Sequence, residues 1–136
     1  MLNVNLPKFL VSVTGLFVFT VLFDHVVHGT LLLPLYESTS TLWRSATDVQ
    51  SLSTLDYVFK LMLSVVITLL FTRHFEDKGI GEGIRFGIFT GLVYGVMKLS
   101  AYIHLPISLD LALGWGIGSL VYAILGGIIL SMLYKK

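Results

Sequence analysis

Residues 83–103 read GIRFGIFTGLVYGVMKLSAYI, and this stretch decides the fold. After Arg85 it carries only one charge, Lys98, and an α-helix needs about 20 mostly apolar residues to cross the hydrocarbon core of a bilayer. Glycine recurs at every fourth position, at Gly83, Gly87, Gly91 and Gly95. Residues four apart lie on nearly the same side of a helix, so the glycines form one stripe that lets another backbone approach closely. The stretch therefore predicts a membrane-spanning helix with a tightly packed face.

The composition of the whole chain agrees with a membrane protein. The 136 residues are 55% hydrophobic and only 12% charged, with a mean hydropathy of +0.88, whereas soluble domains carry about 25% charged residues. A net charge of +1 gives no field that would attract nucleic acid, so no nucleic-acid partner is predicted. Cysteine is absent, which excludes disulfides, thiolate metal sites and cysteine nucleophiles.

Four apolar segments predict an all-α integral membrane four-helix bundle that forms a single transmembrane domain over residues 1–136. Ser53 and Ser108 are plausible starts of the second and fourth helices, because their side chains can accept hydrogen bonds from free backbone N–H groups. A secretory signal over 9–23 is a weaker interpretation of the first segment, since no small-x-small cleavage site follows it. The predicted spans are 9–33, 55–72, 84–103 and 108–134.

Basic residues predict the orientation, because cytoplasmic flanks of membrane helices carry an excess of Lys and Arg. With four spans, the loops on one side of the membrane contain a single basic residue, Arg44. Both termini and the loop 73–83 are therefore expected in the cytoplasm (N-in/C-in), and the loop 36–54 outside, with a short interfacial helix near Leu42-Trp43. The basic residues on the cytoplasmic side are Lys8, Arg73, Lys78, Arg85, Lys135 and Lys136.

In size and hydropathy the chain resembles small four-helix proteins of bacterial inner membranes. That resemblance implies a multi-pass protein of the cell membrane whose first partner is the lipid bilayer. It carries no functional residue over to this sequence.

The glycine stripe predicts helix packing in the manner of a glycine zipper. Candidate partners in the last segment are Gly114 with Gly118, and the series Ser119, Ala123 and Gly127. Packing within one chain is the favoured interpretation. Contact between copies in a homo-oligomer and a glycine-lined conduit for a substrate are the alternatives.

Three charged residues fall inside the predicted spans at a similar depth, in the outer half of the bundle. Asp24 lies near the outer end of the first span, and Lys60 and Lys98 each lie about five residues from an outer helix end. Charges inside membrane helices usually pair, reach the headgroups or line a cavity. We expect either an ion pair of Asp24 with one lysine or an ion pathway.

Histidines add a metal-binding hypothesis to the same region. Asp24, His25 and His28 share one helical turn, and His104 or Asp110 can complete a tetrahedral set for a divalent ion. The spacing permits such a site without being diagnostic, and the H-E-x-x-H motif of zinc proteases is absent. Haem ligation by two histidines and a proton relay are further alternatives. No cofactor is predicted outright.

No catalytic arrangement is evident from the order of the residues. The glycines at 79, 81 and 83 follow no strand, so they indicate a helix cap and turn, not a phosphate loop. We expect a small polytopic membrane protein that is non-enzymatic or an accessory component of a larger membrane assembly. The alternatives are a homo-oligomeric transporter or channel that uses Asp24, His28 and Lys98, and a metal-dependent membrane enzyme.

Overall fold

Four long helices account for most of the chain. The structure is a computed structural model that describes residues 4–135, and the described residues form helices, turns and loops without a strand. By length and apolar composition, the four helices that can cross a membrane are Leu6–Leu31, Ser53–Arg73, Ile80–His104 and Leu109–Leu133. The predicted all-α membrane bundle with four spans is confirmed. Lys136, one of the basic residues assigned to the cytoplasmic side, lies outside the described residues.

The first span is α1 (Leu6–Val26) extended by a π-helical turn (Val27–Leu31). Asn5 caps its start, accepting a hydrogen bond from the backbone N–H of Lys8, and Pro7 occupies the first turn, where a missing N–H costs nothing. The π turn closes with a bond from the Leu32 N–H to the Val27 carbonyl at 2.8 Å. The span thus ends at Leu31, two residues before the predicted boundary.

The connection to the second span contains short helices. They are α2 (Leu33–Glu37), a 3₁₀ turn (Ser40–Leu42) and α3 (Ala46–Ser51). Ser45 caps α3 by accepting from the Asp48 N–H at 3.1 Å. Near Leu42-Trp43, where an interfacial helix is expected, the chain forms the 3₁₀ turn, and the regular α3 begins just after it.

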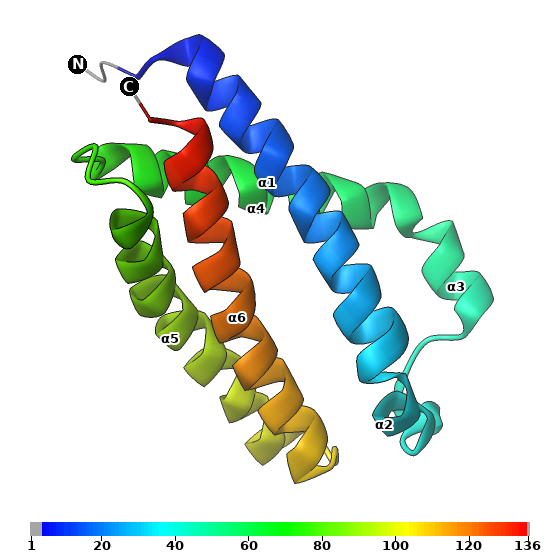
Figure 1. Ribbon diagram of the computed structural model, residues 1–136. Helices are drawn as coiled ribbons and strands as arrows, with labels where there is room; N and C mark the ends of the chain where they lie inside the picture. Colours follow the sequence, from blue (N-terminus) through cyan, green and yellow to red (C-terminus); the bar gives the residue numbers. More distant parts are fainter. Residues whose placement is uncertain (1–3, 136) are drawn as a thin grey trace.

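The last two spans form an antiparallel hairpin. α5 (Ile80–His104) and α6 (Leu109–Leu133) pack along their whole length, joined by a short turn. Figure 1 shows them side by side, with α1 on the other side of α6. Ser108 caps α6, as the sequence indicates, by accepting from the Leu111 N–H at 3.1 Å.

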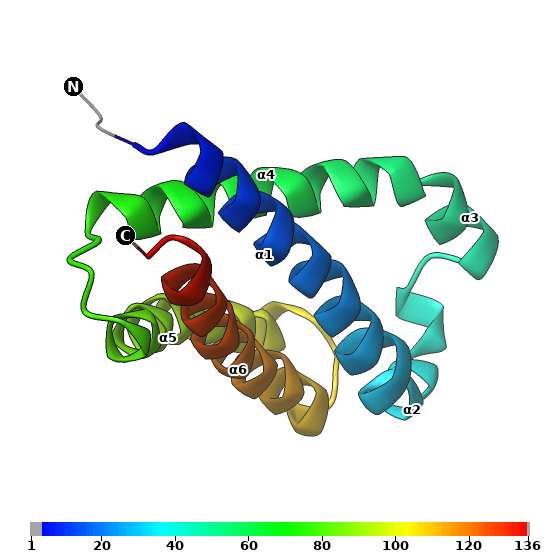
Figure 2. The ribbon, with the colours of Figure 1, turned by 45° about the horizontal axis from the view of Figure 1, so that its top comes forward.

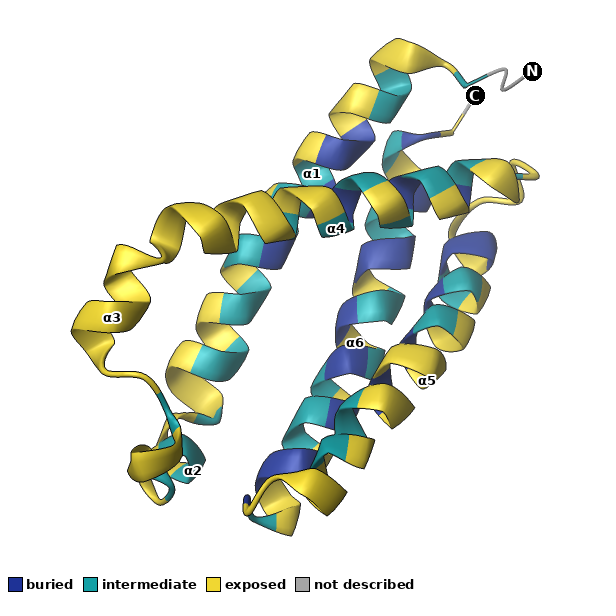
Figure 3. Ribbon diagram, turned by 180° about the vertical axis from the view of Figure 1, so that it is seen from behind, coloured by how far each residue is buried: buried dark blue, intermediate teal, exposed yellow. Residues whose placement is uncertain are grey.

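The second span, α4 (Ser53–Arg73), crosses the other three at a steep angle (Figures 1 and 2). It packs mainly on α1. The buried residues in its middle are the small polar Ser64 and Thr68, which allow close approach. The half of α4 next to α3 is exposed (Figure 3).

The glycine stripe of α5 lies against the backbone of α6. A Cβ added at Gly83 would collide with the Gly127 carbonyl, and one added at Gly87 would collide with the Ala123 carbonyl. At Gly95 a Cβ would lie 2.9 Å from the Gly116 oxygen. These positions tolerate no side chain, because the two backbones touch.

The partners of the stripe differ in part from those the sequence suggested. Gly114 and Gly118 face the first span, where an added Cβ would meet Leu32 and Val27 respectively. The α6 residues that receive the stripe are Gly116, Leu120, Ala123, Ile124, Gly127 and Ser131. α6 carries small residues on two faces, so spacing alone did not reveal which face met α5.

Both termini and the loop after α4 gather at one end of the bundle, called here the basic end (Figures 1 and 2). The Lys8 ammonium donates to the Lys135 carbonyl at 2.8 Å, and the Asn5 N–H donates to the Tyr134 hydroxyl at 3.2 Å. The buried Glu82 carboxylate accepts from backbone N–H groups of the loop, at Glu76 and Lys78. An even number of spans brings both termini to the same end of the bundle, which agrees with the basic residues lying together there.

The packed interior consists of two apolar layers. One lies at the basic end and includes Leu16, Phe71, Leu130 and Tyr134. The other lies at the far end, where Ile107, Leu111 and Ala112 pack with Trp43 and Trp115. Between the two layers the interior is polar.

Replacing Gly87 by alanine tests the contact between α5 and α6. Because the added Cβ would meet backbone, we expect Gly87→Ala to lose about 1–3 kcal/mol of unfolding free energy, as overpacked sites do. Gly81→Ala is the matched control, since nothing lies within 4 Å of a Cβ there; its stability should stay equal or rise slightly. Thermal unfolding in a mild detergent measures both. An unchanged Gly87→Ala midpoint combined with loss of an oligomer would show that the stripe joins two copies instead.

Candidate functional site

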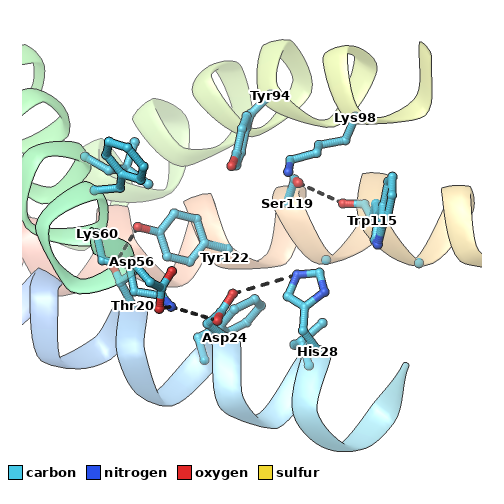
Figure 4. Close-up of a pocket in the computed structure, with 16 residues that line it drawn as sticks. Thr20, Asp24, His28, Asp56, Lys60, Tyr94, Lys98, Trp115, Ser119 and Tyr122 are labelled. Carbon is cyan, nitrogen blue, oxygen red and sulfur yellow. Dashed lines mark hydrogen bonds and ion pairs between the residues drawn. The ribbon is translucent and has the colours of Figure 1, made fainter. Parts of the chain in front are cut away.

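A polar cavity of about 230 Å³ lies between the two apolar layers. All four spans contribute to it, and Figure 4 shows their side chains converging from opposite sides. The side chains that give this polar cavity its name are Thr20, Asp24 and His28 from the first span, Asp56 and Lys60 from α4, Tyr94 and Lys98 from α5, and Trp115, Ser119 and Tyr122 from α6. Apolar residues, Leu63 among them, complete its wall.

On one side of the cavity, Lys60 is held by two carboxylates. Its ammonium lies 3.0 Å from Asp24 Oδ2 and also forms an ion pair with Asp56, one turn earlier on α4. The Lys60 side chain is only 14% exposed, so the two carboxylates replace water as its partners. With two negative charges and one positive charge, this side of the cavity carries a net charge of −1.

On the opposite side, Lys98 contacts aromatic rings. Its ammonium lies 5.4 Å from the centre of the Tyr94 ring and 5.8 Å from that of Trp115, both within the range of cation–π attraction. Among residues 4–135, no carboxylate lies within 4 Å of it. Lys98 extends from α5 toward α6 across the cavity (Figure 4) and leaves a net charge of +1 there.

A chain of hydrogen bonds closes the far end of the cavity. The Trp115 Nε1–H donates to the Tyr36 hydroxyl oxygen at 2.5 Å. The indole can only donate, so the Tyr36 O–H is left to donate to His28 Nδ1 at 2.7 Å. This network assigns the remaining proton of a neutral His28 to Nε2, which lies 4.0 Å from Asp24 Oδ1.

Burial keeps the Tyr36 hydroxyl protonated, so that it can donate a hydrogen bond. Desolvation raises the pKa of its hydroxyl above the ordinary value of 10.0, and the Asp24 charge adds to this, against the opposing hydrogen bond from Trp115. Tyr36 therefore stays protonated at neutral pH.

Tyr122 forms the floor of the cavity toward the basic end. Its hydroxyl shares a hydrogen bond of 2.8 Å with Thr20, and its ring stacks on Phe19 with centroids 5.6 Å apart. Thr20 in turn donates to the Leu16 carbonyl at 2.7 Å. Below these residues lies the apolar layer of the basic end.

The structure brings Asp24, Lys60 and Lys98 to one cavity, but the two lysines have different contacts. Asp24 pairs with Lys60, while Lys98 stands apart against the aromatic rings. The expectation that Asp24 takes one lysine as its partner agrees with this geometry.

The four residues suggested for a metal site are not brought together. His25 is exposed and lies over Gly29, and His104 is exposed at the end of α5. Asp110, the alternative fourth ligand, is exposed in the first turn of α6. Within residues 4–135 no three His, Asp or Glu side chains are close enough to hold a metal ion.

The sequence patterns did not identify several residues in and around the cavity. The spacing of Asp56 with Lys60, and of Tyr94 with Lys98, is four residues, which places each pair on one helical face and was a usable signal. Tyr36 and Trp115 lie 79 positions apart, and nothing local in the sequence links them.

Removing both carboxylates around Lys60 tests the ion network. Asp24→Asn and Asp56→Asn should each cost little stability, because one carboxylate remains. The double variant leaves Lys60 charged without a partner, so we expect a loss of about 3–5 kcal/mol, clearly more than the sum of the single losses. Unfolding of the four proteins in the same detergent gives the coupling energy. Additive losses would mean that the two carboxylates do not share Lys60.

No protein-family model matches the chain, and neither a curated protein nor a solved structure does. The function must therefore be inferred from the geometry of the polar cavity.

Proposed function

We propose that the protein is a non-enzymatic membrane component that binds a small ligand with an anionic group in the polar cavity, and that it serves a larger membrane assembly. The observation that carries this proposal is Lys98, an ammonium that faces the cavity without a carboxylate partner among the described residues. An anion would supply the missing partner through charge-assisted hydrogen bonds.

Binding explains the geometry better than conduction through one chain does. A transporter or channel needs a continuous polar path, and the apolar cluster with Leu16, Phe71 and Leu130 lies between the cavity and the basic end. A homo-oligomeric pathway would have to run outside this layer. Catalysis has less support: the Tyr36 hydroxyl donates to His28, but Asp24 lies 4.0 Å from His28 Nε2, too far for the hydrogen bond that would orient a base.

The proposal extends to location and assembly. We place the protein in a bacterial inner membrane with the basic end in the cytoplasm, because five of the gathered cations lie there; they are Lys8, Arg73, Lys78, Arg85 and Lys135. The polar cavity is then in the outer half. The stripe of α5 acts as a glycine zipper toward α6, and the exposed half of α4 is left for a partner or a second copy.

Titration with sn-glycerol 3-phosphate tests anion binding. In neutral detergent the anion should change the tryptophan emission of the wild-type protein, because Trp115 lines the cavity beside Lys98. Lys98→Met should weaken binding about tenfold to a hundredfold, as expected for loss of a hydrogen bond to a charged group. Lys78→Met, at an exposed lysine of the basic end, is the control and should bind as the wild type. Equal binding by Lys98→Met, or none by the wild type, contradicts the proposal.

Single cysteines test the orientation, since the chain has none of its own. In intact cells a membrane-impermeant maleimide should label Ser40→Cys, in the far-end loop. It should not label His74→Cys, near the basic end, until the membrane is permeabilised. Both positions are exposed, so access to the reagent depends on the side of the membrane alone. The reverse labelling pattern would place the termini outside.

A further inference from the structure

The polar cavity adjoins an apolar groove. The groove has a volume of about 370 Å³ and lies between α4 and α5, with α6 at its base. Cavity and groove share Leu63, Tyr94 and Tyr122 in their walls, so the two lie side by side. From the charged cavity the groove leads toward the basic end, past Val93 and Phe89 to Phe86.

The groove is open to the lipid along α5. Phe89, Val93 and Met97 are 71%, 65% and 66% exposed although they line it. A lipid chain can therefore enter from the side without passing through water. Lys98 and Phe86 are separated by about 18 Å along the helix, at a rise of 1.5 Å per residue, a length suited to an extended acyl chain.

The charges of the cavity are arranged as a dipole. Lys98 provides +1 at the α5 side, and Lys60 with its two carboxylates, Asp24 and Asp56, provides −1 at the α4 side. A zwitterionic headgroup matches both ends, with its phosphate against Lys98 and its ammonium against the carboxylates. A purely anionic headgroup would satisfy Lys98 but would also face the net negative side.

We propose that the bound ligand is a zwitterionic phospholipid of the surrounding bilayer, with its phosphoethanolamine headgroup in the polar cavity and one acyl chain in the apolar groove. This inference rests on the proposed function and specifies its ligand. Lys98 lies about 9 Å from the end of α5 at His104, a depth that a headgroup reaches from the membrane surface. The direction also fits, since the headgroup lies nearer the membrane surface and the chain points inward.

A pair of tryptophan variants separates the groove from the rest of α5. Val93→Trp fills the groove, whereas Val96→Trp places the same side chain on a residue that is 63% exposed and lines neither the cavity nor the groove. Native mass spectrometry of the protein in neutral detergent then counts bound phosphatidylethanolamine and phosphatidylglycerol with identical acyl chains.

The wild type should bind one phosphatidylethanolamine, at least about fivefold more tightly than phosphatidylglycerol. Val93→Trp should weaken this binding about tenfold, because the chain loses its apolar contacts, and Val96→Trp should leave it unchanged. Met97→Trp, also in the groove, provides the same comparison should Val93→Trp fold poorly. Equal binding of the two lipids would overturn the zwitterionic headgroup, and undiminished binding by the groove variants would overturn the acyl-chain site.

Soluble glycerol phosphate keeps the two proposals apart. If the groove variants bind both glycerol phosphate and phospholipid as the wild type does, only the lipid inference fails. If the wild type does not bind glycerol phosphate, the proposed function fails, and the lipid inference, which rests on it, fails with it.

Discussion

The contact between the backbones of α5 and α6 is the constraint on which the rest of the structure depends. In lipid, apolar side chains gain little by leaving the solvent, so helices associate through close van der Waals fit. The α5 glycines give that fit by leaving no α5 side chain at four successive positions that face α6. The result is a rigid hairpin whose α6 side has room for the first span, and α4 is then held by the first span and by the aromatic contacts at the basic end.

This hairpin also determines where polar groups can be placed. Tyr122 and Trp115 project from α6 on the faces not occupied by the stripe, and Lys98 projects from α5 into the same space. The first span and α4 complete the wall with Asp24 and Lys60, which neutralise each other across the two helices. The ion pair is thus a consequence of the packing and at the same time a link that holds α4 to the first span.

Much of the fold could be predicted because its signals are local. Span lengths follow from apolar runs, the start of α6 follows from Ser108, and the close packing of α5 follows from the period of its glycines. The steep crossing of α4 could not be predicted. Apolar residues face both lipid and neighbouring helices in this chain, so hydropathy does not show which face of a helix packs against another helix.

The candidate site was predictable in its charges but not in its contacts. A charge within a span is conspicuous, and Asp24, Lys60 and Lys98 stand out for that reason. The bonds from Trp115 through Tyr36 to His28 depend on the π turn and on α2, which bring Tyr36 back over the cavity. Such a return of the chain is a tertiary feature. Spacing alone also does not show that Gly114 and Gly118 face the first span and not α5.

The environment of Lys98 itself argues for a ligand. A lysine at the centre of a membrane helix costs roughly 2.5 to 3.5 kcal/mol on insertion scales. Lys98 lies nearer the end of α5 and costs less, and a cation–π contact returns about 0.5 to 2 kcal/mol. Two aromatic rings therefore offset part of that cost without neutralising the charge. A methionine at this position would avoid the cost altogether, so an ammonium here brings no benefit to folding. The proposed anionic ligand would give this ammonium the partner that the carboxylates of the described ion pairs, held by Lys60 and Lys78, do not supply.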